Sequence, residues 1–198
     1  SDNYQNSKQY NLEKIMRVIV GCEFSQVVTR AFRDKGHEAY SCDLLPTEGN
    51  PAWHFQEDIL ELLKRERFDL AIFHPPCTHL AVSGARWFKE KRDEQEAALS
   101  FVEALLYAPI EHIALENPVS IISSRIRKPD QIIQPWMFGH GETKAICLWL
   151  KNLPNLLPSN VVDGREARIH KMPPGPDRWK NRSRFYVGVA EAMAEQWG

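Results

Sequence analysis

The sequence predicts one α/β domain in which helices cover both faces of a mostly parallel sheet. Short apolar runs alternate with amphipathic stretches, and the clearest runs lie at residues 16–22, 68–73, 112–115 and 144–150. Strands that alternate with helices are typical of a doubly wound sheet, because right-handed crossovers place the helices on its two faces. With 198 residues, 43% of them hydrophobic, the chain is long enough to bury one core.

The first half of the chain predicts two strand–helix units and a third strand. Residues 1–14 are polar and aperiodic, so we expect a flexible arm ahead of a single domain at residues 15–198. MRVIVGC and FDLAIF have the continuous apolar character of strands buried on both faces. The elements expected in this half are strands at 16–22, 37–41 and 68–73 and helices at 27–35 and 59–64.

The second half continues the alternation. A long amphipathic helix at 91–107 leads to a buried strand at 112–115, and a further strand is expected at 144–150. Residues 152–181 are rich in proline, glycine and charge, and a loop of this length in a compact domain favours substrate binding over simple connection. A last helix is expected at 188–197.

The composition disfavours several classes of protein. A formal net charge of −1 argues against a general binder of polyanions, and the four cysteines form no C-x-x-C pair, which favours reduced thiols over a zinc site or a disulfide framework. No apolar run is long enough to cross a membrane, and no secretory leader is recognised, so we expect a cytoplasmic protein without a membrane partner.

Positive charge is concentrated in one segment near the C-terminus. Residues 163–186 hold seven lysines and arginines against three acidic residues, and Trp179, Phe185 and Tyr186 lie among them. This mixture suits phosphates and stacked bases, whereas the alternative is an ordinary solvated loop. A second aromatic segment, at Trp136 and Met137, fits a packed hydrophobic lid or a platform for a base.

Polar residues follow the ends of the predicted strands. They lie at residues 21–25, at Asp43, at 74–77 and at 116–118. Because ligands bind outside the carboxyl ends of the strands in an open parallel sheet, we expect these four groups to converge on one edge. His74 and His79 have no metal-ligand companions nearby in the sequence, so we expect no metal.

The first two groups favour an adenosine-containing cofactor without phosphates. Asp43 is placed to bind ribose hydroxyls and Asp58 an adenine amino group, although each also fits an ordinary helix N-cap. The first turn has neither G-x-G-x-x-G nor a phosphate-binding Gly-Lys-Thr/Ser. S-adenosylmethionine fits better, because backbone N–H groups near Ser25 and Gln26 could meet its carboxylate.

Cys77 is the most informative single residue. Pro75 and Pro76 stiffen the backbone ahead of it, as in a rigid loop that leaves a buried strand and faces a ligand. The alternative is an inert buried cysteine. Glu116 ends a strand expected near that of Cys77, so roughly 5–10 Å would separate the two side chains, enough for a pyrimidine ring.

The motifs Pro75-Pro76-Cys77 and Glu116-Asn117-Pro118 resemble those of the DNA (cytosine-5) methyltransferases, and in particular a small, phage-like branch of that family. The resemblance covers about residues 16–197 and includes a closing helix at 187–194. It implies a Rossmann-like, S-adenosylmethionine-dependent methyltransferase fold. The residues at positions similar to the family's cofactor contacts are Glu23, Phe24, Ser25, Gln26, Asp43, Asp58 and Pro75.

The resemblance also implies the chemistry. Cys77 would add to carbon 6 of a cytosine flipped out of duplex DNA, and Glu116 would stabilise the adduct while Asn117 orients the loop. For this Glu116 needs a raised pKa or a proton imposed by the base. The family's basic residue at the base carbonyl and phosphate corresponds to Lys144 or to the pair Arg182 and Arg184, and the sequence leaves both placements open.

The chain departs from the family pattern at three points. Gln26 stands where the cofactor turn has a glycine, and Gly188-Val189 replaces a Gly-Asn pair. The large target-recognition domain is missing, so residues 152–181 or a partner would supply sequence specificity.

Three other interpretations remain open. One is an amino-methyltransferase acting on adenine N6 or cytosine N4, although Cys77 occupies the place of the aromatic residue such enzymes carry after Pro-Pro. Another is methylation of a free cytosine nucleotide. The last is a catalytically degenerate protein of the same fold that only binds nucleic acid.

Overall fold

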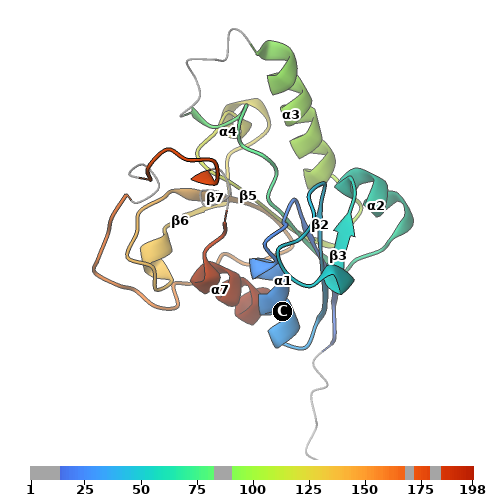
Figure 1. Ribbon diagram of the computed structural model, residues 1–198, viewed down its shortest axis with the longest axis horizontal. Helices are drawn as coiled ribbons and strands as arrows, with labels where there is room; N and C mark the ends of the chain where they lie inside the picture. The colour runs from blue at the N-terminus through green and yellow to red at the C-terminus, as the bar shows by residue number, and fades with distance from the viewer. Residues whose placement is uncertain (1–13, 83–90, 168–171, 179–183) are drawn as a thin grey trace, which may run out of the picture.

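The computed structural model describes residues 14–82, 91–167, 172–178 and 184–198, and its sheet confirms the predicted fold class (Figure 1). Seven strands form one sheet in the order β3-β2-β1-β4-β5-β7-β6. Neighbouring strands from β3 to β5 are parallel, and β7 is antiparallel to both β5 and β6. The strands are β1 Arg17–Gly21, β2 Glu38–Asp43, β3 His54–Gln56, β4 Leu70–Phe73, β5 His112–Asn117, β6 Gln131–Ile133 and β7 Ile146–Lys151.

Helices cover both faces of this Rossmann-like sheet, as Figure 1 shows. Val18 and Val20 of β1 point to the face where Phe32 and Met193 pack, whereas Ile19 points to the opposite face. The first face carries α1 and α7, and the second carries α2, α3 and α4. The helices are α1 Val27–Asp34, α2 Ile59–Arg65, α3 Arg92–Leu106, α4 Ile122–Arg125 and α7 Val187–Trp197, with short 3-10 helices η1 Pro51–Trp53 and η3 Pro135–Met137.

Some elements differ from the prediction in extent. β3 and β6 were not predicted, and β5 continues through Asn117, so that Glu116 and Asn117 are its last two residues. In η3, Met137 packs against the core, and the guanidinium carbon of Arg165 lies 3.8 Å from the centroid of the Trp136 ring. One face of Trp136 is therefore covered, which favours the packed lid. Most of the arm expected at residues 1–14 lies outside the described residues.

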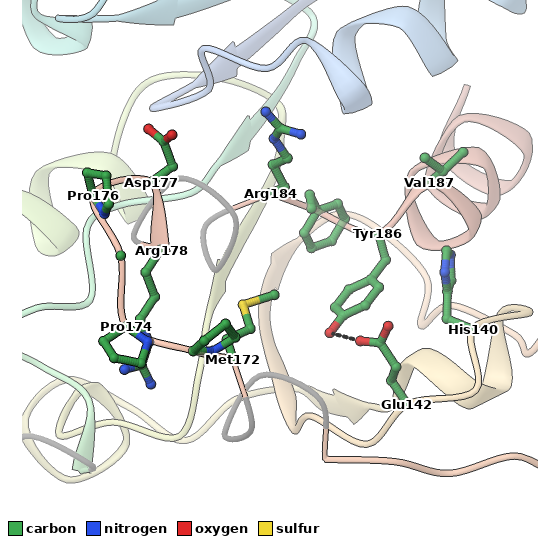
Figure 2. Close-up of a pocket in the computed structure, with 13 residues that line it drawn as sticks. His140, Glu142, Met172, Pro174, Pro176, Asp177, Arg178, Arg184, Tyr186 and Val187 are labelled. Atoms are coloured by element: carbon green, nitrogen blue, oxygen red, sulfur yellow. Dashed lines mark hydrogen bonds between the residues drawn. The ribbon is translucent and has the colours of Figure 1, made fainter.

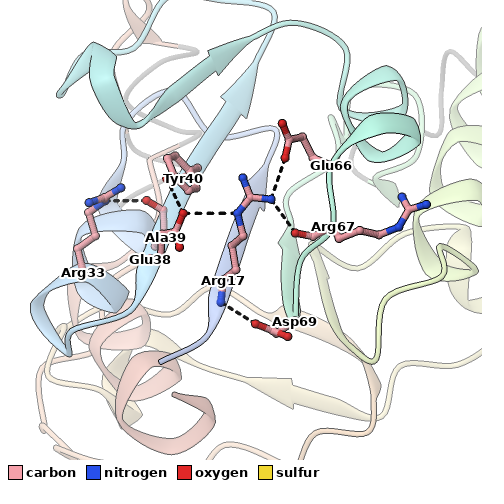
Figure 3. A network of polar contacts seen from close by, with 8 residues as sticks. All are labelled: Arg17, Arg33, Glu38, Ala39, Tyr40, Glu66, Arg67 and Asp69. Carbon is pink, nitrogen blue, oxygen red and sulfur yellow. Dashed lines mark hydrogen bonds and ion pairs between the residues drawn. The ribbon is translucent and has the colours of Figure 1, made fainter. Parts of the chain in front are cut away.

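An ionic network fixes the start of β1, at the edge opposite the strand ends that were predicted to bind ligands (Figure 3). Arg17 Nη1 donates to Glu66 Oε2 and to the Arg67 carbonyl, both at 2.8 Å, and its backbone N donates to Asp69 Oδ2 at 2.8 Å. The guanidinium also lies 4.7 Å from the centroid of the Phe68 ring. These contacts join β1 to the connection between α2 and β4.

In the described part of the chain, we find no helix that is both long enough and apolar enough to cross a bilayer.

Candidate active site

Three of the four predicted groups meet in one cleft at the carboxyl edge of the sheet. It is lined by residues that follow β1 and β4, by the last residues of β5 and the proline after them, and by two basic residues from later in the chain. The predicted site residues that line it are Glu23, Phe24, Ser25, Pro75, Cys77, Glu116, Asn117, Lys144 and Arg184. His74 and Phe185 line it as well, although the sequence did not single them out for this site.

The Cys77 thiol is exposed, so the alternative of an inert buried cysteine is wrong. Pro75 before it is buried, and the Cys77 carbonyl accepts hydrogen bonds from the amides of Leu80 and Ala81, at 3.0 and 2.9 Å. A buried residue on one side and a hydrogen-bonded turn on the other thus hold this loop. The thiol is presented on a fixed backbone.

The loop that carries Cys77 is joined to the segment that follows Glu116. Val82 N donates to the Val119 carbonyl at 3.1 Å, and Ile121 N donates to the Leu80 carbonyl at 3.0 Å. Closer to the cleft, the buried Asn117 donates from Nδ2 to the Pro75 carbonyl at 3.0 Å. Asn117 therefore orients the Pro-Pro-Cys backbone, and the two loops form one unit.

Glu116 is held by a histidine. His74 Nδ1 lies 3.0 Å from Glu116 Oε2, and each of these side chains is 12% exposed. Burial alone would raise the pKa of Glu116, but the hydrogen bond from His74 and the electrostatic effects of His74 and Lys144 outweigh it and bring this pKa below its usual value. Two ways for Glu116 to carry a proton were predicted. The first, a raised pKa, is therefore wrong, whereas the second, a proton imposed by the bound base, stays a prediction.

Each of the two placements left open for the basic residue has one residue at the cleft. Lys144 and Arg184 each line it, and Lys144 is close enough to Glu116 to lower its pKa. Arg184 Nη2 donates to Glu48 Oε2 at 2.9 Å, on the exposed rim. Arg182 lies outside the described residues.

Glu23 has a structural role that the sequence did not predict. Its buried carboxylate accepts hydrogen bonds from Val28 N at 2.7 Å and from Thr29 N at 3.2 Å, and Thr29 Oγ1 donates to it at 2.7 Å. These amides belong to the first turn of α1, whose N-cap residue makes no side-chain cap. Glu23 therefore satisfies donors at the N-terminus of α1, next to the Ser25 and Gln26 amides that were predicted to bind the cofactor.

Gln26 is also turned inward. Its side chain is fully buried, with Nε2 donating to Ser41 Oγ at 3.1 Å and to the Asn50 carbonyl at 2.9 Å, while Oε1 accepts from Asn50 N at 2.7 Å. Its φ of 63° lies in the left-handed region that usually favours glycine. These three hydrogen bonds hold Gln26 in that conformation, and both polar atoms of its side chain are engaged within the protein.

Asp43 and Asp58 lie beside the cleft without lining it. Asp58 Oδ1 accepts from Leu60 N at 2.7 Å and caps α2, so its helix-capping alternative is confirmed for this oxygen. Asp43 Oδ1 accepts from Leu45 N at 2.9 Å, and burial raises the pKa of this carboxyl. Burial raises the pKa of the Cys22 thiol, and the negative charges of Asp43 and Asp58 raise it further.

A second pocket adjoins the cleft and shares Arg184 and Phe185 with it (Figure 2). Residues 172–178, which belong to the predicted substrate loop, form one wall, and Tyr186 Oη donates to Glu142 Oε2 at 2.8 Å in another.

Within the described ranges, no group of three or more His, Cys, Asp or Glu side chains is placed to hold a metal ion.

Strand register could have identified His74. Phe73 of β4 pairs with Leu115 of β5, so the next residues of these parallel strands, His74 and Glu116, stand side by side. His74 was predicted to lie at this edge but was otherwise considered only as a metal ligand, so its hydrogen bond to Glu116 was missed. Phe185, whose ring centroid lies 4.8 Å from that of His74, was noted only as one of the aromatic residues of the basic segment.

No protein-family model matches the sequence, and no curated protein matches it. Solved structures with a similar course of the chain include a provisionally identified DNA modification methyltransferase encoded within a prophage (E. coli), at 13% identity and a TM-score of 0.49 over 73% of this chain and 51% of that one. They also include an rRNA methylase from Escherichia coli, at 14% identity and a TM-score of 0.40 over 70% of this chain and 58% of that one. The 16S rRNA methylase RmtB matches at 14% identity and a TM-score of 0.39, over 70% and 56%. The chain thus spans little more than half the length of these proteins.

Proposed function

We propose that this chain methylates carbon 5 of cytosine in DNA, with S-adenosylmethionine as methyl donor and Cys77 as nucleophile. One observation carries the proposal: an exposed thiol on a fixed Pro-Pro-Cys loop opens into the same cleft as Glu116. A nucleophile facing a carboxylate across a cleft suits covalent attack on a pyrimidine whose ring nitrogen the carboxylate binds.

The residues at the carboxyl edge fit the cofactor. Asp43, at the end of β2, provides a carboxylate for ribose hydroxyls, and the turn after β1 offers backbone atoms and the Ser25 hydroxyl for the methionine end. Cys22 and Gln26 have φ values of 62° and 63°, so the turn follows a path usually made with glycine. When bound, S-adenosylmethionine supplies an electrophilic methyl group.

The residues of the cleft supply the remaining chemistry. The Cys77 sulfur bonds to carbon 6, the C5–C6 π electrons become enamine density at carbon 5, and ring N3 gains the proton that the thiol loses. Glu116 is ionised in the resting site, so it accepts a hydrogen bond from the N3–H of the adduct and stabilises it. Once carbon 5 has been methylated, its proton passes to water, the C–H electrons re-form the C5–C6 double bond and the C6–S bond breaks, and the departing thiolate recovers the proton from N3.

A polymeric substrate is supported by the surroundings of the cleft. Lys144 and Arg184 add positive charge at the cleft, and the adjoining pocket extends beyond the space next to Cys77. We propose that residues 172–178 contact nucleotides that flank the target. The base must leave the duplex, which costs a few kcal/mol.

The test uses a duplex that contains 5-fluorocytosine in varied sequence contexts, incubated with the protein and S-adenosylmethionine. Because fluorine at carbon 5 cannot leave as a proton does, the methylated adduct is trapped, and mass spectrometry should find it on Cys77. Cys77→Ser should bind S-adenosylmethionine normally and form no adduct, whereas Cys42→Ser, at a buried position in β2, should behave like the wild type.

Other outcomes identify the alternatives. An adduct with a free fluorinated cytosine nucleotide but none with the duplex would indicate a nucleotide methyltransferase. Methylation of an amino group, unaffected by Cys77→Ser, would indicate an amino-methyltransferase. Nucleic-acid binding without methyl transfer or adduct in any context would leave a binding protein.

A further inference from the structure

His74 lies in the cleft but is not part of the chemistry described so far. Its backbone N donates to the Gly21 carbonyl at 2.9 Å, which extends the pairing of β1 and β4 by one residue and fixes the imidazole opposite Glu116. The Nδ1 to Oε2 distance of 3.0 Å is that of an ordinary hydrogen bond. The site therefore contains a rigidly mounted imidazole against the carboxylate.

The two nitrogens of this imidazole have different environments. Nδ1 bonds to Glu116, whereas Nε2 is buried and has no hydrogen-bond partner in the described part of the chain. The Phe185 ring packs against the imidazole, with an angle of 57° between the rings. An N–H at Nε2 would be a buried donor without an acceptor, so this environment favours the tautomer that carries its proton on Nδ1 and donates it to Glu116.

The carboxylate is therefore held through one oxygen. Oε2 accepts from His74, and no described residue donates a hydrogen bond to Oε1. The other charged or titratable groups around Glu116 are Lys144, Cys77 and Arg184 in the cleft and Cys147 of β7, whose thiol pKa is raised by burial and then by the charge of Glu116. Among the described residues, His74 is the one that hydrogen-bonds to this carboxylate.

Resting on the proposed function, we infer that His74 is a positioning residue: by donating from Nδ1 to Oε2 it fixes the carboxylate of Glu116 so that Oε1 faces the cytosine. A carboxylate held in this way is complementary to a ring N3 that carries a proton, the state that arises when Cys77 adds to carbon 6. The imidazole touches Glu116 and not the reacting atoms, so it acts on the reaction only through that carboxylate.

The test compares three substitutions of His74. His74→Phe keeps a ring against Phe185 but removes the donor, His74→Asn retains an N–H near the position of Nδ1, and His74→Gln moves it towards the position of Nε2. His112→Phe is the matched control, because His112 stands at the other end of β5 and bonds through Nδ1 to the Asn152 carbonyl at 2.7 Å.

The first readout does not depend on activity. A ¹³C NMR titration of the carboxyl group of Glu116 should show a higher pKa in His74→Phe than in the wild type, since burial then acts with only Lys144 against it. The increase should be smaller in His74→Asn and absent in His112→Phe. An unchanged Glu116 pKa in His74→Phe would overturn the inference, whether or not the protein methylates DNA.

The second readout is the rate of methylation as a function of pH. His74→Phe should lower kcat about 10- to 100-fold with little change in KM, the loss expected for a hydrogen bond to a charged group. Its acid limb should move to higher pH, because activity needs the ionised carboxylate. His74→Asn should recover most of the rate and His74→Gln little. Equal rates in all three variants would overturn the positioning role.

The two proposals fail in different ways. If the wild type neither methylates DNA nor forms an adduct, but His74→Phe raises the Glu116 pKa, the proposed function is wrong and the hydrogen-bond assignment stands. If His74→Phe does not fold, His74→Asn and His74→Gln still separate the two nitrogen positions.

Discussion

Replacing Glu23 with alanine should destabilise the fold, because this carboxylate caps α1 from three residues ahead of the helix N-cap. The change leaves Val28 N and Thr29 N without an acceptor in a buried setting. A buried donor left unpaired costs about 1–3 kcal/mol, and loss of negative charge at a helix N-terminus adds about 0.3–1 kcal/mol. We therefore expect the free energy of unfolding to fall by about 4 kcal/mol, equivalent to a decrease in Tm of about 10 °C for a chain of this size.

Urea unfolding followed by circular dichroism measures this effect. Thr29→Val is a useful comparison, since it removes only the hydroxyl that donates to Glu23 at 2.7 Å and should cost about 1 kcal/mol. The double variant should lose less than the sum of the two, because both changes break the same contact.

A cofactor role for the Glu23 carboxylate predicts a different pattern. Glu23→Ala would then lower the affinity for S-adenosylmethionine, measured by calorimetry, while the free energy of unfolding fell by less than about 1 kcal/mol. That result would refute the capping argument and restore Glu23 as a ligand contact.

Three further changes test other parts of the structure. Iodoacetamide at pH 8 should alkylate Cys77 at least about tenfold faster than Cys42, because burial raises the pKa of Cys42 to about 12 and leaves little thiolate; peptide mass mapping measures both rates. Gly49→Ala should lower the free energy of unfolding by about 1–3 kcal/mol, since a Cβ there would overlap Gln26 Oε1. Arg17→Met should cost about 1 kcal/mol in low salt and less in 1 M salt, as expected for an ionic network that is partly exposed.

Matched controls accompany these changes. Gly175→Ala adds a Cβ with no atom within 4 Å and should leave the free energy of unfolding within about 0.5 kcal/mol of the wild type. Lys64→Met removes an exposed pair with Glu61 and should leave the urea midpoint of unfolding unchanged. The packing argument is contradicted if the Gly49 and Gly175 variants lose equal stability. The network argument is contradicted if the Arg17 and Lys64 variants lose equal stability. Equal alkylation rates of Cys77 and Cys42 would contradict the argument from burial.

The sheet was predictable where burial leaves a pattern in the sequence. β4 is buried throughout and was recognised as a continuous apolar run. β3 and β6 have only three residues each, and β3 has no buried residue, so neither shows the alternation or apolar run that identifies a strand. The antiparallel direction of β7 depends on how the chain returns to the sheet, which local sequence does not encode.

The candidate site was predictable in its location and less so in its contacts. Strand ends brought Cys77 and Glu116 to one cleft, as the rule for open parallel sheets requires. Sequence gives residue types but not the directions of side chains, so Glu23 and Gln26 were assigned to the ligand although they hold the turn from within. The pKa of Glu116 depends on a neighbour from another strand, and it therefore required the register of β4 and β5.

The bonds that join the Cys77 loop to the segment after Glu116 have a consequence for engineering. The main connections run from Val82 to Val119 and from Ile121 to Leu80 through backbone atoms, which exist whatever side chains occupy these positions. We expect these backbone bonds to keep the two segments together when the side chains around them change. Under the proposed function, the two segments form one unit for engineering, in which side chains that face the substrate can be exchanged while Cys77 and Glu116 keep their places.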